Sequence, residues 1–173
     1  MPWTPERLLA LLDDLGVGHS TARHPPVYTV EEASTHTGHL PGGHCKSLFL
    51  KDKKGALWLL VCLDHRRIDM NLLAKAIGAG RLSFGKPELL EEVLGLTPGA
   101  VTPFALVNDP EHRVRVLLDR AMLEHDQLNY HPLTNTATTT IASADLRRFL
   151  DWAGHEVQVL DLDASGIARA EAG

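Results

Sequence analysis

Two apolar runs separated by a short charged turn constrain the fold more than any other feature of the sequence. Residues 45–50 and 56–63 flank the segment KDKKG at 51–55. This order of apolar run, polar turn with glycine and apolar run is typical of a β-hairpin. Both runs are apolar at successive positions rather than at alternate ones, as in strands that are covered on two sides. The sequence therefore predicts a hairpin that is buried on both faces.

Helices are predicted before and after this hairpin. Residues 4–15 place leucines at helical spacing behind Thr4, a capping residue, and Pro5, which suits the first helical position. Thr29 and Glu32 have the spacing of a capping box, in which each side chain binds the other residue's backbone N–H, and predict a short helix that ends at Gly38. The other predicted elements are helices over 69–76, 87–94 and 144–153 (the last capped by Ser143), a second hairpin of residues 104–107 and 114–118, and strands over 134–141 and 157–162.

Strands that arrive as hairpins interrupted by helices indicate an α+β fold, with a mixed, largely antiparallel sheet surrounded by helices. The 173 residues suit one domain, predicted over residues 1–163. The small and polar residues 164–173 are predicted to form a flexible tail. The same order of elements excludes a doubly wound nucleotide fold. The sequence also has neither a Gly-x-Gly-x-x-Gly after a strand nor a Gly-Lys-Ser/Thr phosphate loop, which argues against ATP and dinucleotide chemistry.

Composition narrows the functional classes further. A net charge of −5 argues against broad coating of nucleic acid, and an aromatic content of 5% argues against a base-stacking platform. No segment approaches the roughly 20 apolar residues of a membrane span, and the first residues, MPWTPE, lack the regions of a signal peptide. Two cysteines cannot form a disulfide framework. We therefore expect a cytoplasmic protein with no membrane partner.

Lys46 is the first candidate for a functional side chain. It shares a predicted strand face with Leu48 and Leu50, where a charge is costly unless it meets a partner or a ligand. The alternative is a strand-entry lysine that extends its ammonium group to water. A catalytic dyad with Ser47 is excluded, because neighbouring residues of a strand face opposite sides of the sheet.

Two loops and a set of basic side chains are further candidates. The segment from Gly99 to Pro103 can present backbone N–H groups to a ligand, although such a segment is more often only a turn. His131 precedes a proline, which favours an extended conformation at a strand edge. The basic side chains form either a solvated surface or a docking patch for a polyanion; they are Lys51, Lys53, Lys54, Arg66, Arg67, Arg81 and Lys86.

A metal site is the alternative interpretation of a group of histidines. His36, His39 and His44 lie near Cys45, and these residue types bind zinc. The His-x-x-His spacing lacks the four-residue separation and the glutamate of the zincin helix, and adjacent residues of a strand point apart. We interpret these side chains as ordinary loop histidines, with a metal-dependent hydrolase as the alternative. Cys62 lies within an apolar run and is predicted to be a buried small hydrophobe.

Several segments taken together resemble one known family. They are residues 43–55 (GHCKSLFLKDKKG), 80–84 (GRLSF), 101–104 (VTPF), 108–116 (NDPEHRVRV) and 131–139 (HPLTNTATT). From about His24 to Asp161 the chain resembles the YbaK-like, prolyl-tRNA-synthetase-associated editing domains, and most closely the free-standing Ala-tRNA(Pro) deacylases. The resemblance implies a mixed, partly barrel-like sheet around a small pocket, and hydrolysis of the ester that joins alanine to the 3′ end of proline tRNA.

The resemblance also implies roles for individual residues. Lys46 is implied to be the key active-site lysine, which positions the substrate for attack by a water that the tRNA's own 2′-hydroxyl assists. His131 is implied to be the pocket histidine, and Ser47 stands where relatives usually have asparagine. The implied substrate-binding residues are Tyr28, Thr29, Val30, Ser47, Gly99, Thr102 and Pro103. No cofactor and no metal are implied.

The implied partners are mischarged tRNA(Pro) and prolyl-tRNA synthetase, and not DNA. The basic residues assigned to the tRNA are Lys51, Lys53, Lys54, Arg66, Arg67 and Arg81. An editing enzyme is needed because missing methylene groups are worth only about 1–3 kcal/mol, so a proline pocket cannot strongly reject a smaller amino acid. Two alternatives stay open: a non-catalytic module of the same fold that binds tRNA or a synthetase, and a deacylase for serine-, cysteine- or threonine-charged tRNA.

Overall fold

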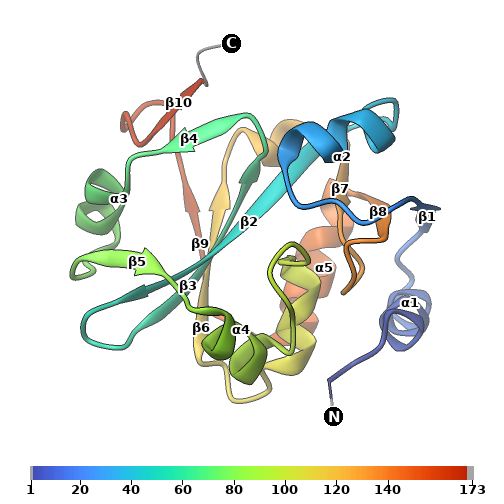
Figure 1. The fold of residues 1–173 in the computed structure, drawn as a ribbon, viewed down its shortest axis with the longest axis horizontal. Helices are drawn as coiled ribbons and strands as arrows, with labels where there is room; N and C mark the ends of the chain where they lie inside the picture. The colour runs from blue at the N-terminus through green and yellow to red at the C-terminus, as the bar shows by residue number, and fades with distance from the viewer. Residues whose placement is uncertain (1, 171–173) are drawn as a thin grey trace.

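The computed structural model describes residues 2–170, and within them an eight-stranded mixed sheet carries helices on both faces (Figure 1). The strand order is β1-β8-β7-β2-β3-β6-β9, and β5 pairs with β2 beside this path. Within residues 2–170, none of the helices combines the length and the apolar character of a membrane span. The strands are β1 (His19–Arg23), β2 (Gly43–Asp52), β3 (Leu57–Leu63), β5 (Leu82–Phe84), β6 (Val114–Asp119), β7 (Gln127–Tyr130), β8 (Ala137–Ala142) and β9 (Val157–Leu160).

The sheet combines antiparallel and parallel pairs, which confirms the predicted α+β fold with a mixed sheet. The pairs β1·β8, β7·β8, β2·β3 and β2·β5 are antiparallel, whereas β2·β7, β3·β6 and β6·β9 are parallel. A second, two-stranded sheet joins β4 (Arg66–Ile68) to β10 (Ala168–Ala170). The helices are α1 (Pro5–Asp14), α2 (Val30–Thr37), α3 (Met70–Ile77), α4 (Pro87–Leu94) and α5 (Ser143–Ala153), with 3-10 helices η1 (Pro103–Asn108) and η2 (Met122–Glu124).

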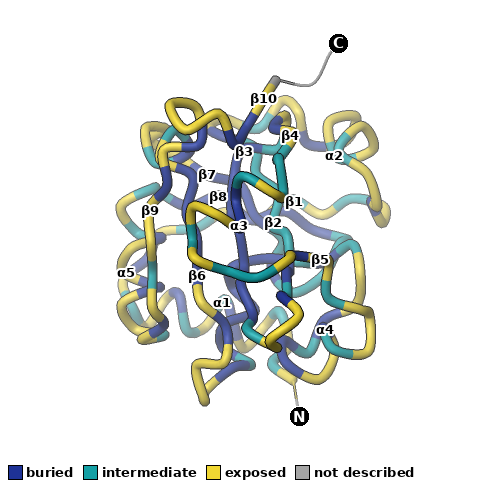
Figure 2. Tube along the Cα trace, turned by 90° about the vertical axis from the view of Figure 1, so that its left-hand side faces the viewer, coloured by how far each residue is buried: buried dark blue, intermediate teal, exposed yellow. Residues whose placement is uncertain are grey.

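Strand β3 explains the apolar pattern that the sequence analysis started from. Leu59 and Val61 face one apolar cluster, which α1, α4, α5 and η1 cover. Leu60 and Cys62 face a second cluster on the opposite side, which α3 and the segment before β10 cover. Every residue of β3 is buried (Figure 2). The predicted β2–β3 hairpin is therefore confirmed, as are the burial of β3 on both faces and that of Cys62 as a small hydrophobe. Residues 45–48 of β2 are only partly buried, which differs from the prediction for this strand.

The predicted second hairpin is wrong. Residues 103–108 form η1, and β6 pairs with β3 and β9 instead of with this segment. Pro103 occupies the first turn of η1, and Thr102 caps it by accepting a hydrogen bond from the Phe104 N–H at 3.3 Å. Residues 103–107 are all buried. A short run that is buried on every side has no periodicity to separate a strand from a helical turn.

Five short strands within the described residues were not predicted from the sequence. Strand β1 is the polar segment HSTAR at one edge of the sheet, β7 has four residues, and β4, β5 and β10 have three residues each. None is long enough to show a run of alternating apolar residues, so pairing with a neighbouring strand defines them. At the last long helix the structure differs by one residue: Ser143 is already within α5, and its hydroxyl donates to the Leu123 carbonyl rather than capping the helix.

The C-terminal segment also differs from the flexible tail that we predicted. Ile167 and Ala168 are buried, and β10 pairs in antiparallel register with β4, with Arg169 opposite Arg67. Asp163 forms an ion pair with Arg66. Composition identified the segment as small and polar, but the long-range pairing with β4 orders it. Residues 171–173 of the predicted tail lie outside the described residues.

Candidate functional site

A cavity of about 200 Å³ lies where β2 and β7 part. The two strands pair in parallel only over Gly43–His44 and Leu128–Asn129, and β2 then continues along β3 alone until β5 joins it at Leu50. The gap that follows is bounded by α2 and the segment before it, the loop before η1, and β7 with the residues after it. A stretch of strand without a neighbour on one side offers its free backbone groups to whatever enters.

Most of the residues that the sequence analysis assigned to substrate meet in this cavity. They come from four segments that are far apart in the chain, and the fold brings them to one place. The predicted residues that line the cavity are Tyr28, Thr29, Val30, Lys46, Ser47, Gly99 and His131. Thr102 and Pro103 do not line it, since both are buried beneath the loop as the start of η1.

Lys46 lies on the β2 face that Leu48 and Leu50 share, next to the second apolar cluster. Its ammonium group does not extend to bulk water alone, because it donates a hydrogen bond to the Arg66 carbonyl oxygen. An ammonium group carries three N–H donors. One is held by Arg66, and within residues 2–170 the others have no partner, so they are available to a ligand in the cavity. The contact with Arg66 fixes the direction in which Lys46 presents its charge.

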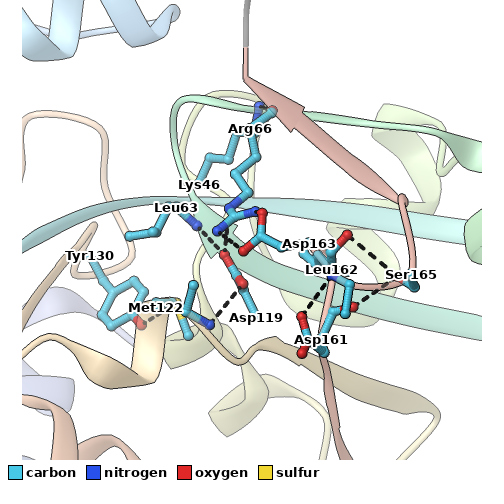
Figure 3. Close-up of polar contacts among 12 residues, drawn as sticks. Lys46, Leu63, Arg66, Asp119, Met122, Tyr130, Asp161, Leu162, Asp163 and Ser165 are labelled. Carbon is cyan, nitrogen blue, oxygen red and sulfur yellow. Dashed lines mark hydrogen bonds and ion pairs between the residues drawn. The ribbon is translucent and has the colours of Figure 1, made fainter.

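Arg66 of β4, whose carbonyl accepts from Lys46, is itself held by two carboxylates (Figure 3). The Arg66 guanidinium pairs with Asp119 at 3.1 Å and donates to both carboxylate oxygens of Asp163, one of them at 2.9 Å. Asp119 is fully buried and also accepts from the Leu63 N–H at 3.2 Å. Hydrogen bonding from Arg66 lowers the pKa of Asp163. Arg66 is therefore committed to the interior and is not free to bind tRNA, which corrects its predicted role.

Asp64 lines the same cavity and was missed by the sequence analysis. It follows β3 directly, and its N–H donates to the His44 carbonyl at 2.9 Å. Asp64 therefore lies opposite His44 of β2, the strand that also carries Lys46. Burial raises the pKa of the Asp64 carboxyl, and the nearby His44, His65 and Lys46 only partly offset this. The signal that could have found it is the hairpin register, which pairs residue 64 with residue 44.

His131 faces the cavity as a neutral imidazole. Its Nδ1 lies 3.1 Å from the Ala137 carbonyl, which can only accept, so Nδ1 carries the proton and Nε2 keeps a free lone pair. Burial lowers the pKa of His131, and the neighbouring His24 lowers it further. The His24 ring is 6.4 Å away and is held by the Pro25 carbonyl and the Thr138 hydroxyl. His131 can therefore accept a hydrogen bond or a proton near neutral pH.

The start of α2 forms one wall of the cavity. Thr29 caps the helix by accepting from the Glu32 N–H at 3.1 Å, as predicted, but the Glu32 carboxylate accepts from the Thr29 hydroxyl rather than from its backbone N–H. Tyr28 is exposed and lies against Gly99, whose φ of 93° is in the left-handed region. A Cβ at Gly99 would lie 3.1 Å from the Tyr28 ring. Glycine is thus required where the loop meets this wall.

Asn129, Tyr130 and Thr138 are further cavity residues that the sequence analysis did not single out. The Asn129 amide donates to the Pro41 and Gly43 carbonyls at 2.9 and 3.1 Å, and so holds the start of β2 against β7. No local sequence pattern marks such a residue, because its two partners lie more than 80 positions earlier. It positions the strand that carries Lys46.

The cysteines and the remaining histidines are not arranged as a reactive site. Burial raises the pKa of the Cys62 thiol to about 12 and raises that of Cys45 further, whereas a cysteine nucleophile needs a lowered pKa. The His44 ring contacts the Leu40 carbonyl at 3.1 Å, and the His36 ring stacks on His24. Within residues 2–170, no group of three or more histidine, cysteine or acidic residues is placed to hold a metal ion.

The predicted tRNA-binding residues are divided between two places. Arg67 is exposed on β4, next to the residue whose carbonyl holds Lys46. Lys51, Lys53 and Lys54 lie at the turn of the β2–β3 hairpin, near Gly80 and Arg81. At a rise of about 3.3 Å per residue, the seven positions from Lys46 to Lys53 correspond to roughly 23 Å. The turn is thus the far end of β2 from the cavity (Figure 1).

Comparison with known proteins identifies the family. Residues 24–149 match the model of the aminoacyl-tRNA editing domain. The chain is 40% identical over 154 residues to a prolyl-tRNA synthetase associated domain-containing protein 1 of Bos taurus, covering 86% of this chain and 90% of that protein. It is 33% identical over 158 residues to the prolyl-tRNA editing protein ProX of Acetoanaerobium sticklandii, covering 91% and 96%.

A solved structure has the same fold. It is described as that of a candidate trans-editing enzyme for prolyl tRNA synthetase, and it superposes with a TM-score of 0.68 at 23% identity, covering 90% of this chain and 95% of the other. The match spans almost the whole of both chains, so the two proteins share one overall fold.

Proposed function

The chain belongs to the aminoacyl-tRNA editing domain family, and from this we propose that it is a trans-acting deacylase that hydrolyses mischarged tRNA, with Ala-tRNA(Pro) as its substrate. The observation that carries the proposal is the cavity between β2 and β7, in which Lys46, His131, Gly99 and the start of α2 meet. Prolyl-tRNA synthetase is the proposed partner whose errors the enzyme removes.

The small apolar side chains of the cavity support alanine as the amino acid. Small apolar side chains line its α2 side, namely Val27, Val30 and Ala33, with Val101 from the loop before η1. A methyl group fits among such side chains, whereas the ring of proline adds two methylene groups to be accommodated. A synthetase pocket built for proline cannot strongly reject alanine, because the missing methylene groups are worth little binding energy. A smaller editing pocket that excludes proline by shape would supply this discrimination.

In this proposal Lys46 binds the 3′ end of the substrate, and His131 contacts the attacking water or the sugar. The N–H groups of Lys46 that Arg66 does not take bind the ester or the phosphate of the terminal adenosine, which fixes the 3′ end and stabilises negative charge that develops on the ester. The free Nε2 of His131 accepts a hydrogen bond from the attacking water or from the sugar. The 2′-hydroxyl of the tRNA assists the water, so the protein needs no nucleophile of its own.

Release of alanine from preformed Ala-tRNA(Pro) tests the proposal. We expect rapid hydrolysis of this substrate and slow hydrolysis of Pro-tRNA(Pro), with Lys46→Ala lowering kcat/KM by at least about 100-fold, as for removal of a charge-stabilising donor. Lys75→Ala, at an exposed position of α3, is the matched control and should leave the rate unchanged.

Other outcomes would assign a different function. Faster hydrolysis of Ser-tRNA or Cys-tRNA(Pro) than of Ala-tRNA(Pro) would keep the reaction and change the substrate. Turnover of none of these substrates would exclude the deacylase and favour a module that binds tRNA or a synthetase without hydrolysis. Loss of activity on chelation, with Lys46→Ala still active, would favour a metal-dependent hydrolase.

A further inference from the structure

The hairpin register places Asp64 and Lys46 on one face of the sheet. Lys46 pairs with Cys62, and Asp64 lies opposite His44. Asp64 is the first residue after β3, and its N–H bond to the His44 carbonyl continues the ladder by one position, so Asp64 is a diagonal cross-strand neighbour of Lys46. Both residues line the cavity. The cavity lining therefore contains a cationic and an anionic group.

The Asp64 carboxylate has no ion-pair partner within 4.0 Å among residues 2–170. Its backbone N–H donates to the His44 carbonyl at 2.9 Å, and in this part of the chain the only hydrogen bond that bears on the pKa of its carboxyl comes from its own backbone. Lys46 does not neutralise it, because the Lys46 ammonium donates to the Arg66 carbonyl instead. Burial accordingly raises the pKa of Asp64. A partly buried carboxylate without a partner is costly, and a ligand that supplies a positive donor removes the cost.

The substrate of the proposed reaction brings such a donor. An aminoacyl ester has a free α-amino group, and α-amino groups titrate near about 8, so much of the substrate is cationic at neutral pH. Lys46 would repel this cation. Asp64 is the one acidic residue that lines the cavity within the described part of the chain.

We infer that Asp64 binds the α-ammonium group of the aminoacyl ester and makes the cavity selective for esters that carry a free amino group. The inference rests on the proposed deacylase function and deepens it. Asp64 and Lys46 then hold opposite ends of one small group: the carboxylate holds the amino end, and the ammonium group holds the ester or the nucleotide. This arrangement orients the carbonyl between them.

Two substrates that differ only in the α-substituent test the inference. Alanyl-tRNA(Pro) carries the ammonium group, and lactyl-tRNA(Pro), prepared from it by deamination with nitrous acid, carries a hydroxyl in its place. The measurement is kcat/KM of the wild type and of Asp64→Asn on both. Asparagine keeps the shape and removes the charge. Asp64→Glu keeps the charge, and Asp151→Asn changes an exposed aspartate of α5 in the same way.

We expect Asp64→Asn to lower kcat/KM for the alanyl ester by about 10–100-fold, as for loss of a charge-assisted hydrogen bond, and to change the lactyl ester by less than about threefold. Asp64→Glu should recover part of the loss, and Asp151→Asn should behave as the wild type. An equal fall for both esters would overturn the inference, because a structural role does not distinguish the α-substituent. Failure of the wild type on both esters would instead overturn the proposed function.

Discussion

An aspartate lies at each end of the β2–β3 hairpin, and the pKa values of the two carboxyls are shifted in opposite directions. At the turn, the Asp52 carboxylate accepts three backbone hydrogen bonds of 3.0 Å, from Lys54, Ala56 and Gly80. The Gly80 N–H contributes most to lowering the pKa of Asp52. At the other end, Asp64 accepts no hydrogen bond from the backbone of another described residue, and burial raises the pKa of its carboxyl.

The Asp52 carboxylate stabilises the fold, whereas the Asp64 carboxylate is available to a ligand. Asp52 ties the hairpin turn to the segment between α3 and β5, and both of its carboxylate oxygens accept hydrogen bonds from the backbone. Asp64 and the free donors of Lys46 are not satisfied in this way. A protein that leaves opposite charges unsatisfied in one cavity loses stability there, and a substrate with complementary groups recovers it.

The largest effect should come from breaking the network that anchors the cavity end. Arg66→Ala leaves the fully buried Asp119 without its cation, and removal of one member of a buried ion pair costs about 3–5 kcal/mol. Urea unfolding measures this loss. Arg67→Ala, at the exposed neighbouring position, should change the free energy of unfolding by less than about 0.5 kcal/mol. Equal effects of the two variants would show that the Arg66 pairs contribute nothing.

A smaller effect should distinguish the two aspartates by the sign of their contribution to stability. Asp52→Asn should lower the unfolding temperature by about 3–6 °C, as for loss of one or two hydrogen bonds in a chain of this size. The amide has only one acceptor oxygen, so at least one of the three N–H groups faces an NH2 group. Asp64→Asn should instead raise the unfolding temperature at pH 7, because it removes a charge that burial disfavours.

The pH dependence sharpens this contrast. The folded pKa of Asp52 is below the unfolded value of about 3.9, so its stabilisation is present above that pH and is lost as the pH falls through the folded pKa. The folded pKa of Asp64 is above its unfolded value, so stability is lost as the pH rises from about 3.9 through the folded pKa. Unfolding curves from pH 7 to pH 3 should show both variants converging on the wild type at low pH, from opposite sides. Parallel curves would contradict the assignment.

The smallest effect should come from replacing exposed basic residues, namely Arg67 beside the cavity and Lys53 at the hairpin turn. Arg67→Glu, beside the cavity, should lower the slope of log kcat/KM against log salt concentration by about 1, as for loss of one phosphate contact, with kcat at saturation unchanged. Lys53→Glu, at the far end of β2, should lower the slope by less. A larger effect at Lys53 than at Arg67 would place the body of the tRNA along the hairpin rather than across β4.

Much of the fold could be predicted because its signals are local. The cap of α1 at Thr4, the cap of α3 at Asp69 and the left-handed glycines at 78 and 95 each act within a few residues. The buried hairpin could be predicted because a run of apolar residues at every position requires cover on both faces. The family resemblance added the residues from distant segments that line the cavity, which no local pattern joins.

The sequence by itself determined the helices, the central hairpin and the identity of Lys46 as a charge on an apolar face. Only the tertiary structure decided that residues 103–108 form a 3-10 helix and that the C-terminal segment pairs with β4. It also decided that Arg66 forms ion pairs with Asp119 and Asp163. It likewise placed Asp64, which has no ion-pair partner among residues 2–170, in the same cavity as Lys46. The physical reason is range: caps, turns and periodicity are satisfied by near neighbours, whereas the partner of a buried charge is chosen by strand register and packing between segments far apart in the chain.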